Sequence, residues 1–322
     1  MNNIKSIDID RKLKWKQNQP LFLAFISFLV IVILSQVLMP GFLSANHMNT
    51  LVNQAAFLGI AAIGQMLVVM TGGIDMSIGY TVTLGSVLAA NIMSHNNANT
   101  WKAIVIVILA GIIVGVINAT GVYYLRIPSL VMTLGVGNIV YGFFLLYSDG
   151  APSGYRSDML AGFVNDKIGN VISGQLFIWL VLSVVMVILL KRMVTGRSIY
   201  AYGTNAEAAR YSGVNSAVVV YFVYLVSAVL SSVVGLLLVG YAGSASIRAG
   251  DAYNMDTITA VVLGGTSISG GKGSYWGLIL GVLIMYTLSS LLAMVNIPQY
   301  GKDILQGVII LAMILLVYRN RD

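Results

Sequence analysis

The sequence predicts an all-α fold: a polytopic membrane helix bundle with about ten transmembrane helices and both termini in the cytoplasm. Hydrophobic residues occupy 58% of the 322 positions and charged residues only 9%, whereas a soluble domain is about 45–50% apolar and about 25% charged. Apolar stretches of about 20 residues, long enough to cross a bilayer as a helix, recur along the chain. Lysine and arginine are unevenly distributed among the connections between them.

The predicted elements follow one another through mostly short connections. Residues 1–20 form a basic cytoplasmic segment, residues 21–318 a single transmembrane domain, and residues 319–322 a cytoplasmic tail. The third and eighth spans are short and carry Gly, Ser or Thr. The ten predicted spans are 21–39, 50–70, 77–94, 102–123, 129–147, 175–191, 217–240, 254–270, 275–294 and 303–318.

The basic residues set the predicted orientation, because cytoplasmic loops are enriched in lysine and arginine. With the N-terminus inside, 13 of the 18 basic residues face the cytoplasm and 5 face outward. The net charge of +7 is therefore explained by membrane topology and by contact of the N-terminal segment with lipid headgroups. It does not indicate a nucleic-acid binder.

Two connections are long. The stretch 148–174 is predicted to be extracellular, where it either caps the outer mouth, receives a soluble partner, or is a passive loop. The stretch 191–216 is predicted to be cytoplasmic. Its middle, Thr204 to Tyr211, has the composition of a short helix, with Thr204 as N-cap, Glu207 at the capping-box position and Gly213 at the stop. Such a short helix needs a packing partner, which is either a cytoplasmic protein or the membrane surface.

Few ionisable groups fall inside the predicted spans. Asp75, Asp256 and Lys272 lie at span ends, and the absence of mid-membrane carboxylates argues against an ion-coupled secondary carrier. Uncharged polar residues in the spans either hydrogen-bond a hydroxyl-rich solute or link helix to helix. They are Asn53, Gln54, Gln65, Asn118, Thr133, Asn138 and Tyr141, of which Asn53, Gln54, Asn118 and Asn138 are the candidates for a translocation path.

The sequence does not indicate an enzyme or a metal-binding protein. The chain has no cysteine and only two histidines, His47 and His95, so no metal site is expected. It also lacks an H-E-x-x-H motif. The glycine-rich stretch Thr266 to Gly273 resembles a phosphate-binding loop, but these two end residues stand where that motif requires Gly and Ser or Thr. We therefore expect no enzyme activity in this chain.

Glycines indicate close helix packing. Gly111 and Gly115 form one G-x-x-x-G pair, and residues 273, 277 and 281 form a double step. The pairs at 72–73 and 264–265 end predicted spans in a similar way and hint at an internal duplication.

Three motifs carry a resemblance to a known family. TGGIDMSIG at 71–79, GRSIYAYGTNAEAARYSGV at 196–214 and YNMDTITAVVLGGTSISGGKGSYWG at 253–277 resemble the membrane permease subunits of ribose-type ABC sugar importers. The resemblance runs from about residue 45 to the C-terminus, with departures at Asn254 and Met76. Its motif turns contain Gly72, Gly73, Asp75, Ser77, Gly79, Asp256, Gly264, Gly265, Gly270, Gly271 and Lys272.

The resemblance implies a role in a larger assembly in the bacterial cytoplasmic membrane. A second permease copy, identical or not, would complete the path. An extracellular or periplasmic sugar-binding protein would deliver the sugar, and separate ATPase subunits would use ATP and Mg, so that no cofactor binds here. The resemblance also implies that a coupling helix contacts the ATPase through Asn205, Glu207, Ala208, Arg210 and Gly213.

Other functions stay open at this point. A sister-group ABC permease would carry nucleosides or branched-chain amino acids, and an ion-coupled carrier would need no ATPase.

Overall fold

The computed structural model describes residues 21–168, 172–298, 300–305, 307–308 and 311. The predicted segment 1–20, the tail 319–322 and most of the span 303–318 lie outside these residues. The described chain is mainly helical, as predicted, with a small antiparallel sheet that pairs residue 167 with 173 and 168 with 172. In chain order the elements are a helix Leu21–Leu38, α2 (Ala45–Met70), α3 (Ile78–Met93), η1 (Asn97–Asn99), α4 (Thr100–Tyr123), α5 (Ser129–Tyr147), α6 (Asp158–Asn165), β1 (Lys167–Ile168), β2 (Ile172–Ser173), α7 (Gly174–Arg192), α8 (Val194–Thr204), α9 (Ala206–Tyr211), α10 (Ser216–Ala242), α11 (Tyr253–Leu263) and α12 (Tyr275–Met294).

Seven helices in the described part of the chain are long and apolar enough to cross a membrane. They are Leu21–Leu38, η1 with α4, and α2, α5, α7, α10 and α12. The membrane bundle is thereby confirmed, whereas the count of ten spans is not. Two predicted spans fall short of a full crossing, because α3 has 16 residues and α11 has 11.

The predicted span 254–270 is wrong in its second half, because α11 ends at Leu263. Gly265 takes the left-handed conformation at φ +78°, and the N–H groups of Gly265 and Thr266 donate to the carbonyls of Val262 and Val261. This pair of bonds is a Schellman motif, which ends a helix without leaving its last carbonyls unpaired. The chain then forms an irregular glycine loop over 264–274 before α12 begins.

The end of α2 has the same motif. Gly72 has φ +82°, and Gly72 and Gly73 donate to the carbonyls of Val69 and Val68. The two similar glycine pairs therefore share a helix-ending geometry, which accounts for their likeness without an internal duplication.

The core is built around α10, which packs against α2, α3, α4 and α6. Small residues allow this close approach: a Cβ added at Gly115 would lie 2.8 Å from Leu225 Cα, and one at Gly111 would lie 2.9 Å from Val229 Cα. The predicted packing role of this pair is confirmed. On the other side of the bundle, a Cβ at Gly281 would lie 1.9 Å from the carbonyl oxygen of Ala260, so α12 and α11 are equally close.

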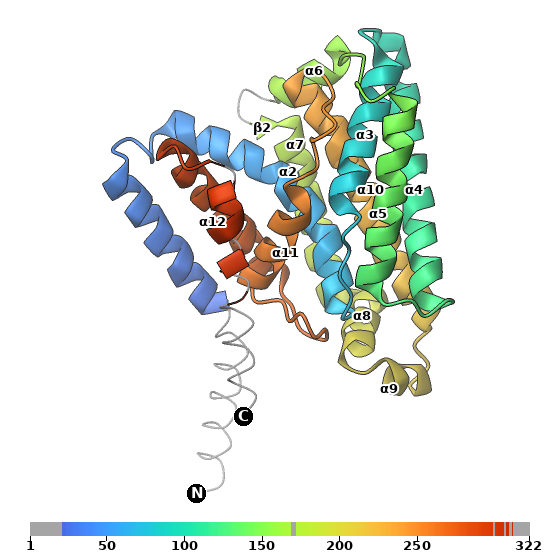
Figure 1. The fold of residues 1–322 in the computed structure, drawn as a ribbon. Coiled ribbons are helices and arrows are strands. Elements are labelled where there is room, and N and C mark those ends of the chain that lie inside the picture. The colour runs from blue at the N-terminus through green and yellow to red at the C-terminus, as the bar shows by residue number, and fades with distance from the viewer. Residues whose placement is uncertain (1–20, 169–171, 299, 306, 309–310, 312–322) are drawn as a thin grey trace, which may run out of the picture.

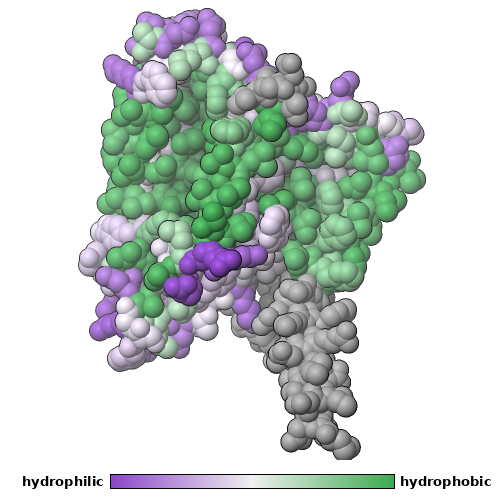
Figure 2. Space-filling view, turned by 180° about the vertical axis from the view of Figure 1, so that it is seen from behind, coloured by the Kyte–Doolittle hydropathy of each residue, from purple (hydrophilic) through white to green (hydrophobic). Residues whose placement is uncertain are grey.

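The surface has the pattern of a protein immersed in lipid. Figure 2 shows a broad apolar band between polar ends. Large exposed apolar side chains lie on Leu21–Leu38, α4, α5 and α7, whereas 83% of the most apolar window of α2 is buried inside the molecule. The ring of outer helices therefore faces lipid or another subunit, and α2 lies in the centre.

The two ends of the bundle differ (Figure 1): α6 and the small sheet lie at one, which we call the α6 end, and α8 and α9 at the other, the α9 end. The stretch 148–174 is not an unstructured loop. Within it, α6 packs against α10, and Arg156 Nη1 donates to the carbonyl of Gly240 at 2.9 Å. This folded cap fixes the C-terminal end of α10.

Candidate functional site

The predicted short helix exists as α9, with a corrected N-terminus. Thr204 is the last residue of α8, and its hydroxyl donates to the carbonyl of Tyr200. The N-cap is Asn205, whose Oδ1 accepts the N–H of Ala208 at 2.9 Å. The predicted capping box, with Thr204 as N-cap and Glu207 three residues on, is therefore wrong. With Asn205 as N-cap, the third helical position is Ala208, and the Asn205 side chain alone accepts a free N–H group of the first turn.

The predicted stop at Gly213 is confirmed. Gly213 has φ +85°, its N–H donates to the carbonyl of Arg210, and Val214 donates to Ala209. This third Schellman motif ends α9 abruptly and turns the chain into α10.

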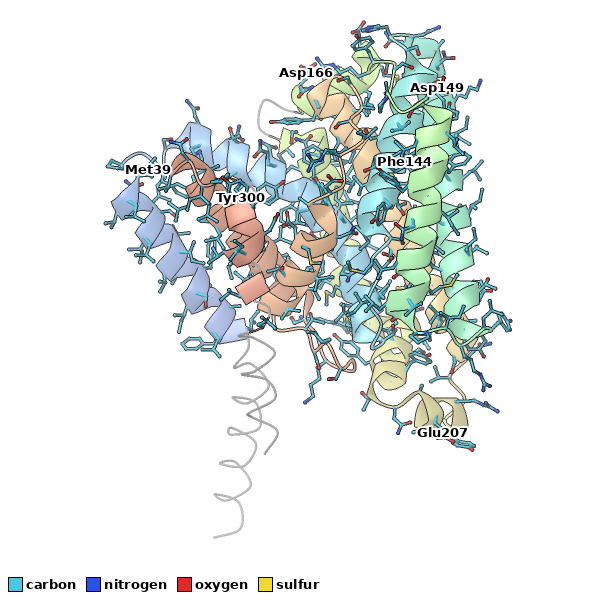
Figure 3. The ribbon with its side chains drawn as sticks, in the orientation of Figure 1. Met39, Phe144, Asp149, Asp166, Glu207 and Tyr300 are labelled. Atoms are coloured by element: carbon cyan, nitrogen blue, oxygen red, sulfur yellow. The ribbon has the colours of Figure 1, made fainter. Side chains whose placement is uncertain are left out.

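α9 presents an exposed surface at the tip of the molecule, where Figure 3 labels Glu207. Ala209 is the residue of α9 that is buried, which holds the helix in place. Tyr211, which sequence reasoning missed, is 82% exposed at the same tip. The predicted contact residues are all exposed: Asn205, Glu207, Ala208, Arg210 and Gly213.

The C-terminal end of α8 meets two other segments in a three-way junction. The N–H of Gly271 donates to the carbonyl of Met70, the last residue of α2, at 3.0 Å. Gly203 lies directly against this bond, since a Cβ added to it would be 1.8 Å from Met70 O and 2.6 Å from Gly271 N. The junction thus joins α8, α2 and the glycine loop 264–274 with no side chain between them.

Tyr200 adds a second link between α8 and the glycine loop. Its hydroxyl donates to the carbonyl of Gly273 at 2.7 Å. A tyrosine hydroxyl is already protonated at neutral pH, and burial raises the pKa of Tyr200 further, so this donor persists into more alkaline solution. Neither Gly203 nor Tyr200 was singled out from the sequence, although a glycine inside a short helical segment is a signal of close packing.

The glycine turns of the loop behave as predicted. Gly270 and Gly271 have φ +81° and +71°, and the N–H of Ser267 donates to the carbonyl of Lys272 to close the loop. Lys272 is exposed, and Asp256 lies in the first turn of α11.

A buried polar cluster surrounds Asp75, which is fully buried. Its Oδ1 accepts the Ser77 N–H at 2.9 Å and the Ser77 hydroxyl at 2.6 Å, and its Oδ2 accepts the Ser227 hydroxyl at 2.7 Å. Asn118 Nδ2 donates in turn to the Ser77 oxygen at 2.9 Å. The cluster ties the segment 71–77 to α4 and α10.

The prediction that Asp75 lies at a span end is wrong. Ser227 is the twelfth of the 27 residues of α10, so its partner Asp75 lies near the middle of the bundle. The segment 71–77 runs inward from the α9 end before α3 begins, as Figure 1 shows. The bundle therefore does contain a carboxyl group near its middle, so the expected lack of one does not count against an ion-coupled carrier.

Irregular backbone inside a bilayer needs internal hydrogen-bond partners. For the segment 71–77 they come from α5: the Ser129 hydroxyl oxygen accepts the N–H of Ile74 at 3.1 Å, and Thr133 Oγ1 accepts the N–H of Met76 at 2.9 Å. Ser129 was not foreseen, because its role depends on a segment 55 residues away.

The four predicted path residues are not brought together. Asn118 belongs to the Asp75 cluster, and Asn53 and Gln54 bond to Ser173 and Tyr241 near the α6 end. Asn138 is exposed on α5. The first three link one helix to another element, so their side chains do not line a common path.

The comparisons with known proteins agree with the motifs. Residues 47–314 match the family described as the permease component of the branched-chain amino acid transport system. The chain belongs to this permease family. It is 32% identical to the ribose import permease protein of Haemophilus influenzae and 33% identical to that of Bacillus subtilis, each over 91% of both chains. It is 32% identical to the galactose/methyl galactoside import permease protein of Salmonella typhimurium over 94% of this chain and 95% of that one. No solved structure matches the chain significantly.

Proposed function

We propose that this permease is the membrane subunit of an ATP-driven ABC importer for a small sugar. The observation that carries the proposal is similarity over more than nine-tenths of the chain to import permeases named for ribose and galactose. In this proposal the permease itself catalyses no covalent reaction. ATP and Mg are used by a separate cytoplasmic ATPase, and a sugar-binding protein outside the membrane delivers the solute.

The charge distribution supports placing the α9 end in the cytoplasm of a bacterial inner membrane. Arg197 and Arg210 lie on α8 and α9, and Lys191 and Arg192 end the helix that leads into them. Both termini would then be cytoplasmic, and α6 would face the binding protein.

The α9 surface is proposed as the contact with the ATPase. It offers an exposed acidic and an exposed basic side chain within one turn, Glu207 and Arg210, beside the exposed aromatic ring of Tyr211. Aromatic and arginine side chains dominate protein interfaces, and charges of both signs set the register of docking. Because the N-cap and the Schellman motif fix both ends of α9, a force on this surface moves α8 and the junction with α2.

The direct test is uptake of labelled ribose or galactose into vesicles that contain this permease, its ATPase and its binding protein. We expect uptake to require all three proteins and hydrolysable ATP. Uptake that persists without ATP and stops when the ion gradient is collapsed would overturn the proposal in favour of an ion-coupled carrier.

A second substrate class follows from the family description, which names branched-chain amino acids. Competition between labelled and unlabelled solutes distinguishes a sugar permease from an amino-acid permease. Excess unlabelled ribose or galactose is expected to block uptake, and block by leucine alone would identify an amino-acid permease.

Replacing both Glu207 and Arg210 by alanine is expected to lower ATP-driven uptake about tenfold, a loss of ~1.4 kcal/mol in the coupled step. Membrane insertion and the yield of folded permease should be unchanged, because both side chains are exposed. The matched control is Arg197→Ala, an exposed basic residue on α8. Unchanged uptake and unchanged ATPase binding in the double variant would contradict the coupling role.

A further inference from the structure

We propose that a cavity between α3, α5, α11 and the segment 243–252 is the subsite through which the transported monosaccharide passes. The cavity has a volume of about 230 Å³. The inference rests on the proposed function and goes beyond it, because it names the residues that hold the solute. The lining residues are Gly79, Tyr80, Thr83, Tyr141, Phe144, Ile247, Asp251 and Asn254.

Two short helices begin at this cavity. α3 starts after the broken segment 71–77, and α11 starts after the irregular segment 243–252. Hydrogen bonds join α3 to this region: Asn254 Oδ1 in the first turn of α11 accepts the Gly79 N–H at 2.8 Å, and Thr83 Oγ1 accepts the N–H of Gly250, just before α11, at 3.0 Å. In many membrane transporters the solute site lies where broken helices meet inside the bilayer, and the partial positive charge at their N-terminal ends favours groups that carry negative or partial negative charge.

The cavity is lined by both aromatic and polar side chains, the two kinds of group that contact a sugar. Tyr141 packs edge-on against Tyr80 and Phe144, with ring centroids 6.2 and 5.2 Å apart. Asn254 and Asp251 add an amide and a carboxylate to the lining, and the Asp251 carboxylate also accepts from Arg248 Nε at 2.8 Å. Small-molecule sites are mostly apolar with a few placed polar groups, and a monosaccharide has apolar C–H faces and a rim of hydroxyls.

The position of the cavity fits transit. Tyr141 lies six residues before the end of α5 at Tyr147, which places it roughly 9 Å inside the bundle from the α6 end at 1.5 Å per residue. Tyr141 and Asp251 are both exposed, so the cavity opens to the molecular surface. The volume is below the roughly 300–1,000 Å³ of sites for drug-sized ligands, which favours one sugar ring over two.

The natural chain has no cysteine, so single thiols can be placed without other changes. In the complete transporter during ATP turnover, we expect the thiol of Tyr141→Cys to react with a small polar methanethiosulfonate reagent. Ribose or galactose at twice its half-saturating concentration should slow this reaction about threefold, as expected for simple occupancy. The matched control is Ile139→Cys on the exposed face of α5 outside the cavity lining, where sugar should have no effect.

Transport gives the second readout. Tyr141→Ala is expected to lower sugar uptake about tenfold while ATP hydrolysis stimulated by the binding protein stays near the wild-type rate, and Asp251→Asn should change the preference between ribose and galactose. The cavity assignment, but not the proposed function, would be overturned by three results together. The wild-type complex takes up sugar, sugar does not slow the reaction of the Tyr141→Cys thiol, and Tyr141→Ala takes up sugar at the wild-type rate. A wild-type complex that takes up no monosaccharide would instead overturn the proposed function, and this assignment with it.

Discussion

Replacing Gly203 by valine is expected to uncouple ATP hydrolysis from transport. The new side chain cannot fit where it is placed, because its Cβ would lie 1.8 Å from Met70 O and 2.6 Å from Gly271 N. α8 must move away from α2 and from the glycine loop, and the bond between Gly271 and Met70 is lost or distorted. α9 keeps its own caps, so ATPase binding should persist.

The measurement compares sugar uptake and ATP hydrolysis in the same vesicles. We expect uptake of Gly203→Val to fall by at least about tenfold, corresponding to ~1.4 kcal/mol or more, while hydrolysis continues. Ala201→Val is the matched control, because Ala201 is exposed on the same helix. Full uptake by Gly203→Val would show that the junction does not transmit motion.

The long spans could be predicted from the sequence because their signal is local. The predicted limits of the fifth and ninth spans, 129–147 and 275–294, coincide with α5 and α12. Length and hydropathy decide such helices, since every backbone group in lipid is satisfied within the helix itself.

The broken helices could not be predicted in this way. Residues 264–270 are apolar or small enough to continue a span, but Gly265 adopts a left-handed conformation and ends α11 early. The segment 71–77 is likewise held by Ser129 and Thr133, which lie more than 50 residues along the chain. The periodic pattern of apolar residues carries no information about such long-range hydrogen bonds.

In the candidate site, too, features set by local sequence could be predicted, whereas features set by long-range contacts could not. The short helix α9, its stop at Gly213 and the glycine turns follow from composition and were predicted as local structure, with the N-cap of α9 placed one residue too early. The junction at Gly203 and the cavity at Tyr141 depend on segments that meet only in the folded bundle. The path predicted from polar residue types alone was not assembled, because in Asn118 and Asn53 the amide groups bond to neighbouring elements.

Asp75→Ala is expected to destabilise the permease strongly. The carboxylate accepts hydrogen bonds from the Ser77 N–H, the Ser77 hydroxyl and the Ser227 hydroxyl, and all three donors are buried. Removing the acceptor leaves them unpaired in a region without bulk water, at a cost of about 1–3 kcal/mol for each unsatisfied group. A total of about 3 kcal/mol or more is comparable to a large part of the net stability of a typical domain.

Asp75→Asn distinguishes the hydrogen bonds of this side chain from its charge, because asparagine has the same shape but no carboxylate. Its Oδ1 can still accept from both Ser77 donors, and its Nδ2 can donate to the Ser227 oxygen in place of the lost acceptor. We therefore expect this variant to stay within about 1 kcal/mol of wild type, on the scale of one rearranged hydrogen bond. Thermal unfolding in detergent, followed by the fraction of monodisperse permease, measures both variants against Asn138→Ala, a polar residue exposed on α5.

The pair of variants also decides what the buried carboxyl is for. If Asp75→Asn folds and imports sugar at the wild-type rate, the cluster serves to hold the segment 71–77 against α4 and α10, and no charge or proton at this position takes part in transport. If Asp75→Asn folds normally but loses uptake, the carboxylate itself has a transport role that an amide cannot fill. A stable, fully active Asp75→Ala would contradict both, because it would show that the inward segment keeps its position without the hydrogen bonds that now define it.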